Sequence, residues 1–192
     1  MGIVGLMKTA PAVTIAFKEE GRSVILLGGL GSSDLTRFGG TQYAKVVLNQ
    51  MWGLPPALDL DYEKRVQTAI REIVAAGLAE SAHDLSGGGL AMALAACSME
   101  GVGAAIELAT DLRPELALFH EAPSRILVSS AVPEKIEEIA KRHKVEAARI
   151  GVTMKEGIRI RNASVTWIDC PVDRLQQVWE SALENHLEPQ YA

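Results

Sequence analysis

The sequence predicts an α/β domain in which helices are layered on a mixed β-sheet. Short runs rich in apolar and β-branched residues alternate along the chain with segments whose apolar residues recur at helical spacing. Strand pairs around turn sequences, typical of hairpins, lie near both ends. We therefore expect one domain over residues 1–192, with leading strands and a hairpin in 1–30, a core in 31–170, and a C-terminal helix and tail in 171–192.

Three strands are predicted at the start of the chain. They are Ile3–Met7, the alternating Val13–Phe17, and Ser23–Gly28, which is apolar enough to be buried on both faces of a sheet. The charged turn Glu19–Arg22 predicts that the second and third strands form a hairpin. Because the chain opens directly on an apolar strand pattern, we expect it to be a piece of a longer protein.

A glycine-rich stretch, 28–40, follows with five glycines. Its length suits either a functional loop or an irregular extension of the hairpin, and both interpretations remain open. Residues 41–49 predict a short helix, and the two prolines in 51–56 predict a connector.

The strongest helical pattern spans Tyr62–Ala76, begun by Asp59 or Asp61 and ended by Gly77. Beyond it, predicted strands lie at 79–84, 103–108, 126–130 and 147–152, and a hairpin at 158–161 and 165–169. Predicted helices lie at 90–97, 113–119, 134–143 and 172–184, and the last of these is expected to turn four apolar residues inward: Leu175, Val178, Trp179 and Leu183.

The candidate site is the turn between the predicted strand 79–84 and the helix that follows it. The strand ends at Asp84, and Ser86 precedes the run Gly87, Gly88 and Gly89. Amides at a helix N-terminus favour an anion, glycines allow a ligand to approach the backbone, and Asp84 would hold a cation bridging to phosphate. Alternatively, Ser86 is an N-cap and the glycines serve tight packing. The run is no Walker A loop, because it lacks that motif's lysine.

A second polar turn precedes the predicted strand 126–130. Glu121 and Arg125 either lie at the rim of the same site or form an ion pair in an exposed turn, which would contribute little stability.

Composition excludes several classes of function. The net charge of −5 argues against a nucleic-acid-binding surface, and no apolar run reaches the roughly 18 residues that span a membrane. Cys97 and Cys170 have no partner spacing and the four histidines no ligand spacing. We expect a cytoplasmic protein with reduced cysteines that binds neither membrane nor nucleic acid.

A resemblance to a known family rests on four motifs that follow in the family's order and spacing: LG at 27–28 with GGTQY at 39–43, PPALDL at 55–60, HDLSGGGL at 83–90 and LFHEAPSR at 118–125. In this order they resemble the C-terminal domain shared by aminoimidazole ribonucleotide (AIR) synthetase and its relatives. Within that superfamily the chain is similar to the last domain of phosphoribosylformylglycinamidine synthase, large subunit, from about residue 2 to beyond residue 153.

The resemblance implies an AIR-synthase C-terminal-domain-like fold within an ATP-dependent ligase of purine synthesis, which uses ATP, Mg²⁺ and ammonia from glutamine. It implies as partners the upstream domains of the same large subunit, a glutaminase subunit and a small accessory subunit. The family's catalytic histidine lies upstream, so we expect no catalytic residue here and no activity of this chain alone. Asp84 would bind the metal, and the nucleotide or its phosphates would contact Asp84, Ser86, Gly87, Gly88, Gly89, Glu121 and Arg125.

Three departures from the family pattern indicate an auxiliary site that binds a nucleotide for structure. Gly87 stands where the family often has an acidic residue, His120 replaces a glycine, and 122–124 differs from a substrate-contacting segment.

Two alternatives remain. One is another superfamily member, such as AIR synthetase or a hydrogenase-maturation dehydratase, against which PPALDL and the full HD-x-S form argue. The other is an interaction module that binds no nucleotide. An apolar patch left by absent neighbours would favour self-association.

Overall fold

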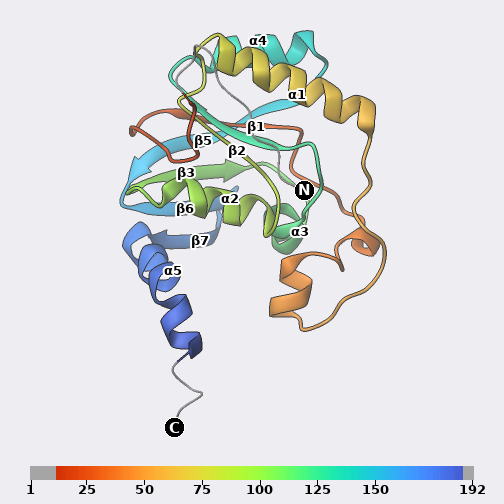
Figure 1. Cartoon of the computed structure of the whole chain (residues 1–192), viewed down its shortest axis with the longest axis vertical. Helices are drawn as coiled ribbons and strands as arrows, with labels where there is room; N and C mark the ends of the chain where they lie inside the picture. The colour runs from red at the N-terminus through yellow and green to blue at the C-terminus, as the bar shows by residue number, and fades with distance from the viewer. Residues whose placement is uncertain (1–11, 188–192) are drawn as a thin grey trace.

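The computed structural model describes residues 12–187, so the strand predicted at 3–7 lies outside the described residues. The described chain forms a mixed seven-stranded sheet with helices on both faces, which confirms the predicted α/β class (Figure 1). The strands, in the spatial order β2-β4-β1-β5-β3-β6-β7, are β1 Ser23–Leu27, β2 Ser81–Asp84, β3 Val102–Leu108, β4 Ile126–Ser130, β5 Ala147–Lys155, β6 Gly157–Asn162 and β7 Val165–Pro171. The helices are η1 (3₁₀) Leu35–Arg37, η2 (π) Tyr43–Val47, α1 Leu60–Ala75, α2 Gly89–Ser98, α3 Pro114–Phe119, α4 Pro133–Arg142 and α5 Val172–Leu187.

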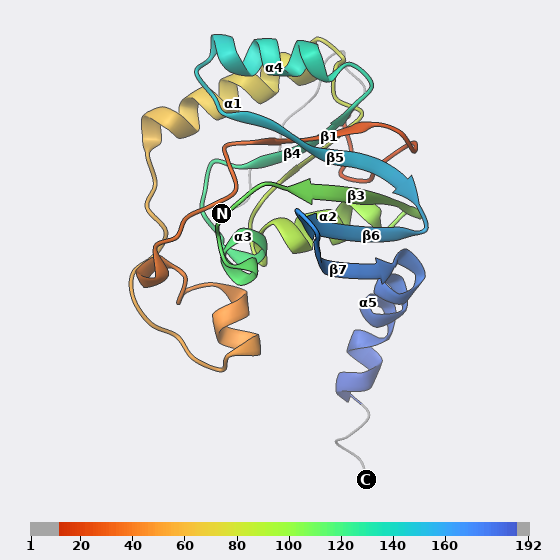
Figure 2. The same ribbon diagram turned by 180° about the vertical axis from the view of Figure 1, so that it is seen from behind.

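The sheet separates two apolar cores. Helices α2 and α3 lie on one face, and α1 and α4 cover the other (Figures 1 and 2). The central strand β1 supplies both cores, because Val24 and Leu26 point to the first and Ile25 and Leu27 to the second. Each fully buried aliphatic side chain contributes about 1.5–3 kcal/mol. The prediction that this strand is buried on both faces is confirmed.

The N-terminal hairpin is a wrong prediction. Strand β1 pairs antiparallel with β4 on one edge and with β5 on the other, so neither edge is left for residues 13–17. Thr14 makes a single bridge to Ser81, and the Phe17 amide donates to the Cys97 carbonyl at 2.8 Å. A charged glycine turn is a local signal, and it was overridden by pairing with strands far along the chain.

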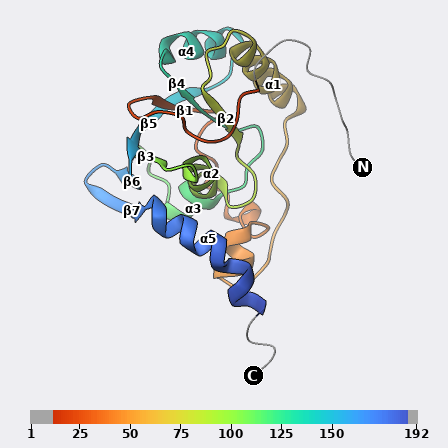
Figure 3. The ribbon, with the colours of Figure 1, turned by 60° about the vertical axis from the view of Figure 1, so that its left-hand side comes forward.

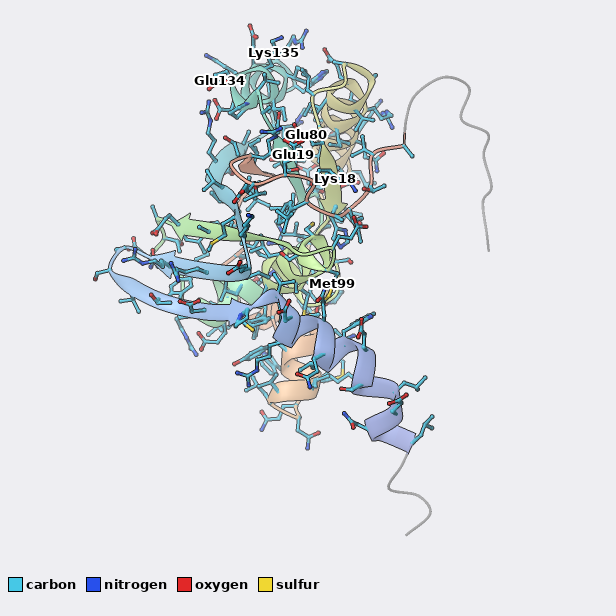
Figure 4. The ribbon with its side chains drawn as sticks, turned by 90° about the vertical axis from the view of Figure 1, so that its left-hand side faces the viewer. Lys18, Glu19, Glu80, Met99, Glu134 and Lys135 are labelled. Carbon is cyan, nitrogen blue, oxygen red and sulfur yellow. The ribbon has the colours of Figure 1, made fainter. Side chains whose placement is uncertain are left out.

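The turn before β1 is hydrogen-bonded to Thr153 of β5 and also makes ion pairs. The Arg22 guanidinium bonds to Glu80 at 2.8 Å and also contacts Glu19. The two carboxylates lie side by side in Figure 4. This pairing attaches the N-terminal segment to the start of β2.

Helix α5 differs from its prediction in what it buries. Its first five residues pack on the domain: Leu175 contacts the core as predicted, and the Gln176 amide donates to the Met99 carbonyl at 2.6 Å. Beyond them the helix extends past the sheet (Figure 3), and Val178, Trp179 and Leu183 are exposed rather than inward. The helical spacing was read correctly, but the described residues supply nothing for that face to pack against.

Candidate functional site

The candidate turn begins where β2 ends beside β4. Asp84 pairs with Ile126 in the sheet, and the next amide, of Leu85, donates to the Arg125 carbonyl at 3.0 Å. The Leu85 side chain enters the core and anchors the turn, whereas the Asp84 side chain is 73% exposed. The strand end therefore presents this carboxylate to solvent.

The three glycines have different reasons to be glycine. Gly88 and Gly89 have φ values of +82° and +61°, and a Cβ on Gly89 would lie 2.7 Å from the His120 carbonyl oxygen. Gly87 is exposed, and a Cβ there would meet nothing closer than Gln42 Cγ at 3.7 Å. Backbone conformation and packing thus require Gly88 and Gly89, whereas Gly87 faces open space.

Ser86 does not cap α2. The N-cap position is Gly88, without a side-chain hydrogen bond, while the Ser86 carbonyl accepts from the Gly89 amide at 3.0 Å. The N-cap alternative is therefore wrong, and Ser86 lies exposed beside Gly87.

Glu121 joins the predicted motifs in space. Its Oε1 atom accepts hydrogen bonds from the amides of Gln42 and Gly88, both at 2.7 Å. The GGTQY, HDLSGGGL and LFHEAPSR motifs therefore meet at one carboxylate. The role of Gln42 could not be predicted from its side chain, because only its backbone amide takes part.

Arg125 is 2% exposed, so the alternative of an ion pair in an exposed turn is wrong. Its guanidinium donates to the carbonyls of Ala122 at 3.0 Å, Leu30 at 3.2 Å, and His120. Burial lowers the pKa of Arg125 to about 10, while the charge of Glu121 acts in the opposite direction. The bond to Leu30 draws the glycine-rich stretch against this turn, so that stretch is no hairpin extension.

His120 lies beneath the site and is 1% exposed. Its ring centroid is 6.1 Å from that of Phe38, and neither ring nitrogen has a hydrogen-bond partner among the described residues. Burial, and then the nearby charge of Arg125, lower the pKa of His120. Both effects favour the neutral form of the imidazole.

Two hollows flank the glycine turn. One of about 380 Å³ opens beside Asp84, and another of about 320 Å³ lies against Gly87 and Gly88 and is mostly apolar. The first is lined by Leu58, Glu63, Val66, Asp84, Leu85, Pro123, Ser124, Arg125 and Ile126. The second is lined by Gln42, Tyr43, Val46, Val47, Gly87, Gly88, Met92 and Phe119. Sequence reasoning missed Glu63 and Ser124, which only the fold brings beside Asp84.

The side chains near Asp84 suit a cation that is shared with a phosphate group, rather than one whose ligands all come from the protein. Within residues 12–187, no group of three or more His, Cys, Asp or Glu side chains could hold a metal. Mg²⁺ at nucleotide sites takes one or two carboxylates and completes its shell with phosphates and water. The exposed carboxylate of Asp84 suits the role of such a ligand.

Among residues 12–187, none of the helices combines the length and the apolar character that a membrane span requires.

Comparison with known proteins gives one family. Residues 19–161 match the family described as AIR synthase related protein, C-terminal domain. A curated relative, phosphoribosylformylglycinamidine synthase subunit PurL of Thermoanaerobacter sp. (strain X514), is 35% identical over 193 residues, covering 98% of this chain and 26% of the relative. The chain thus spans about a quarter of the length of that relative.

Solved structures show the same fold. Thermotoga maritima PurL complexed with FGAR superposes with a TM-score of 0.74 at 24% identity, covering 85% of this chain and 29% of that one. The same protein complexed with ATP gives a TM-score of 0.68 at 24% identity, with 85% and 27% covered.

Proposed function

The chain belongs to the AIR synthase related proteins, whose C-terminal domain it matches, and from this premise we propose that it is one domain of a phosphoribosylformylglycinamidine synthase. The enzyme would be an ATP-dependent ligase of purine synthesis in the cytoplasm that takes its ammonia from glutamine. The relative's description as a subunit supports partner subunits, which we propose to be a glutaminase and a small accessory protein. The chain alone would contribute no catalytic residue.

One observation carries the site proposal: an exposed carboxylate, Asp84, stands beside a hollow on a turn where three family motifs meet. We propose that Asp84 ligates Mg²⁺ and that Ser86 and Gly87 face the phosphates of a nucleotide. Gly88, Gly89, Glu121 and Arg125 lie behind this edge and fix its shape. When bound, Mg²⁺ would neutralise phosphate charge. The mostly apolar second hollow is the surface that we assign to upstream domains of a larger subunit.

The test uses a PurL-length protein that contains this chain. We expect Asp84→Asn to weaken Mg²⁺–nucleotide binding about tenfold or more, because a contact to a charged group contributes about 1.5–3 kcal/mol. Asp111→Asn, in an exposed loop, is the matched control. Unchanged nucleotide content and synthase rate in Asp84→Asn would show that the site assignment is wrong.

A further inference from the structure

The carboxylate of Glu121 sits where a phosphate would be expected. Gly88 and Gln42 are the N-cap residues of α2 and η2, and Glu121 Oε1 accepts from both of their amides at 2.7 Å. These residues are separated from Glu121 by 33 and 79 positions in the sequence. At the N-terminus of the ten-residue helix α2, free amides and the helix dipole favour an anion. The protein supplies that anion from its own chain.

We propose that Glu121 is a positioning residue that keeps phosphate off the N-terminus of α2 and fixes the glycine turn, so that a nucleotide is held from the Asp84 side. The inference rests on the proposed function for its ligand, but the contacts of Glu121 are independent of that ligand. An intramolecular carboxylate already placed on both amides excludes a competing anion by occupying its site.

The surroundings of the two amides support this assignment. Val46, Val47, Met92 and Phe119 line the hollow on that side, which is mostly apolar, so a phosphate there would depend on the two amides that Glu121 already occupies. On the other side of the turn the hollow carries the carboxylate of Asp84 and leaves room for a hydrated cation. The charged part of a nucleotide therefore approaches along Asp84 and Ser86, accompanied by its cation, rather than along the axis of α2.

The test follows the amides of Gly88 and Gln42 by ¹⁵N NMR in the 192-residue chain, with inorganic phosphate as the probe. In the wild type we expect neither signal to respond to phosphate. In Glu121→Ala we expect both amides to exchange with solvent about tenfold faster, since each loses an acceptor. Both signals should also shift saturably with phosphate, which enters the vacated position.

Two variants complete the design. Glu121→Gln keeps an acceptor oxygen without the charge, so it should restore slow exchange at both amides even if Glu121→Ala folds poorly. Glu138→Ala, on the exposed face of α4, removes a carboxylate elsewhere and should change neither signal. A merely structural role for Glu121 would alter exchange without creating a phosphate response.

Three results would overturn the proposal: a saturable phosphate shift of Gly88 and Gln42 in the wild type, fast exchange of both amides in Glu121→Gln, or a folded Glu121→Ala that ignores phosphate. Failure of the proposed function looks different. In that case Mg²⁺–nucleotide would not perturb Asp84 in the larger protein, while the amide results in this chain would stand.

Discussion

At the scale of single residues, the glycines of the turn have different roles: Gly89 is required for packing, whereas Gly87 leaves space open for a ligand. Gly89→Ala would place a methyl group in the left-handed region and 2.7 Å from the His120 carbonyl oxygen. We expect it to lower the free energy of unfolding by at least about 2 kcal/mol, measured by urea denaturation. Gly87→Ala meets only open space and should change stability by less than about 0.5 kcal/mol. Equal losses in the two variants would contradict this division.

His120 predicts a pH dependence of stability. Its pKa in the folded protein is lowered by burial and by Arg125, whereas Asp34 and Glu121 act in the opposite direction. The unfolded chain therefore binds a proton that the folded chain resists. The stabilisation that comes from keeping His120 neutral is fully present above the ordinary histidine pKa of about 6.5. It declines as the pH falls below that value toward the lowered pKa of His120 in the folded protein.

Urea unfolding at a series of pH values checks this expectation. The Gln side chain in His120→Gln cannot be protonated, so the decline in stability below about pH 6.5 should become shallower by the linkage of up to one proton. His83→Gln, at the partly exposed histidine next to Asp84, is the control substitution. An identical pH slope in wild type and His120→Gln would show that His120 is protonated without cost to the fold.

The sequence predicted only those parts of the candidate site whose residues follow one another along the chain. Asp84 at a strand end and the glycines after it were predictable, because strand, turn and helix follow one another along the chain. The contacts of Glu121 were not, since its partners are two backbone amides far away in sequence. Nor was the burial of Arg125, because a charged side chain in a turn is ordinarily exposed.

At the scale of elements, helix α1 begins through one side chain. Asp59 Oδ1 accepts from the amides of Asp61 at 2.9 Å and Tyr62 at 3.0 Å. We expect Asp59→Ala to lower the free energy of unfolding by about 1 kcal/mol, by chemical denaturation. Asp61→Ala removes a charge from the same turn without removing the cap and should cost clearly less. The reverse order would assign the start of α1 to Asp61.

Except for the strand predicted at 13–17, which makes only an isolated bridge, the described elements were predictable in kind and order, whereas their neighbours in the sheet were less predictable. The hairpin of β6 and β7 was predicted correctly because the two strands are joined by a short turn. Strand β1 instead pairs with β4 and β5, which follow it by about a hundred residues or more. Turn chemistry carries no information about such distant partners, so the predicted pairing of residues 13–17 with β1 was wrong.

At the scale of the whole molecule, apolar exposure gathers at one end. Large hydrophobic residues are exposed on η2, on the connector that follows it and on α5, which project at the same end of the molecule (Figures 1 and 2). Such a concentration of apolar surface marks an interaction site or a tendency to associate. Because Trp179 and Leu183 are 69% and 68% exposed, they add little to the stability of the domain itself.

The last prediction concerns this face of α5. Because Trp179 and Leu183 lie on one side of the helix and contact solvent, replacing both with Glu should suppress concentration-dependent self-association, measured by sedimentation velocity, and change the unfolding free energy by less than about 1 kcal/mol. The control, Gln177→Glu with Ser181→Glu, adds the same charge to the polar face of α5 and should leave association unchanged. If both double variants reduce association equally, net charge rather than the apolar stripe governs it. A large loss of stability in Trp179→Glu with Leu183→Glu would instead mean that α5 folds back onto the domain in solution.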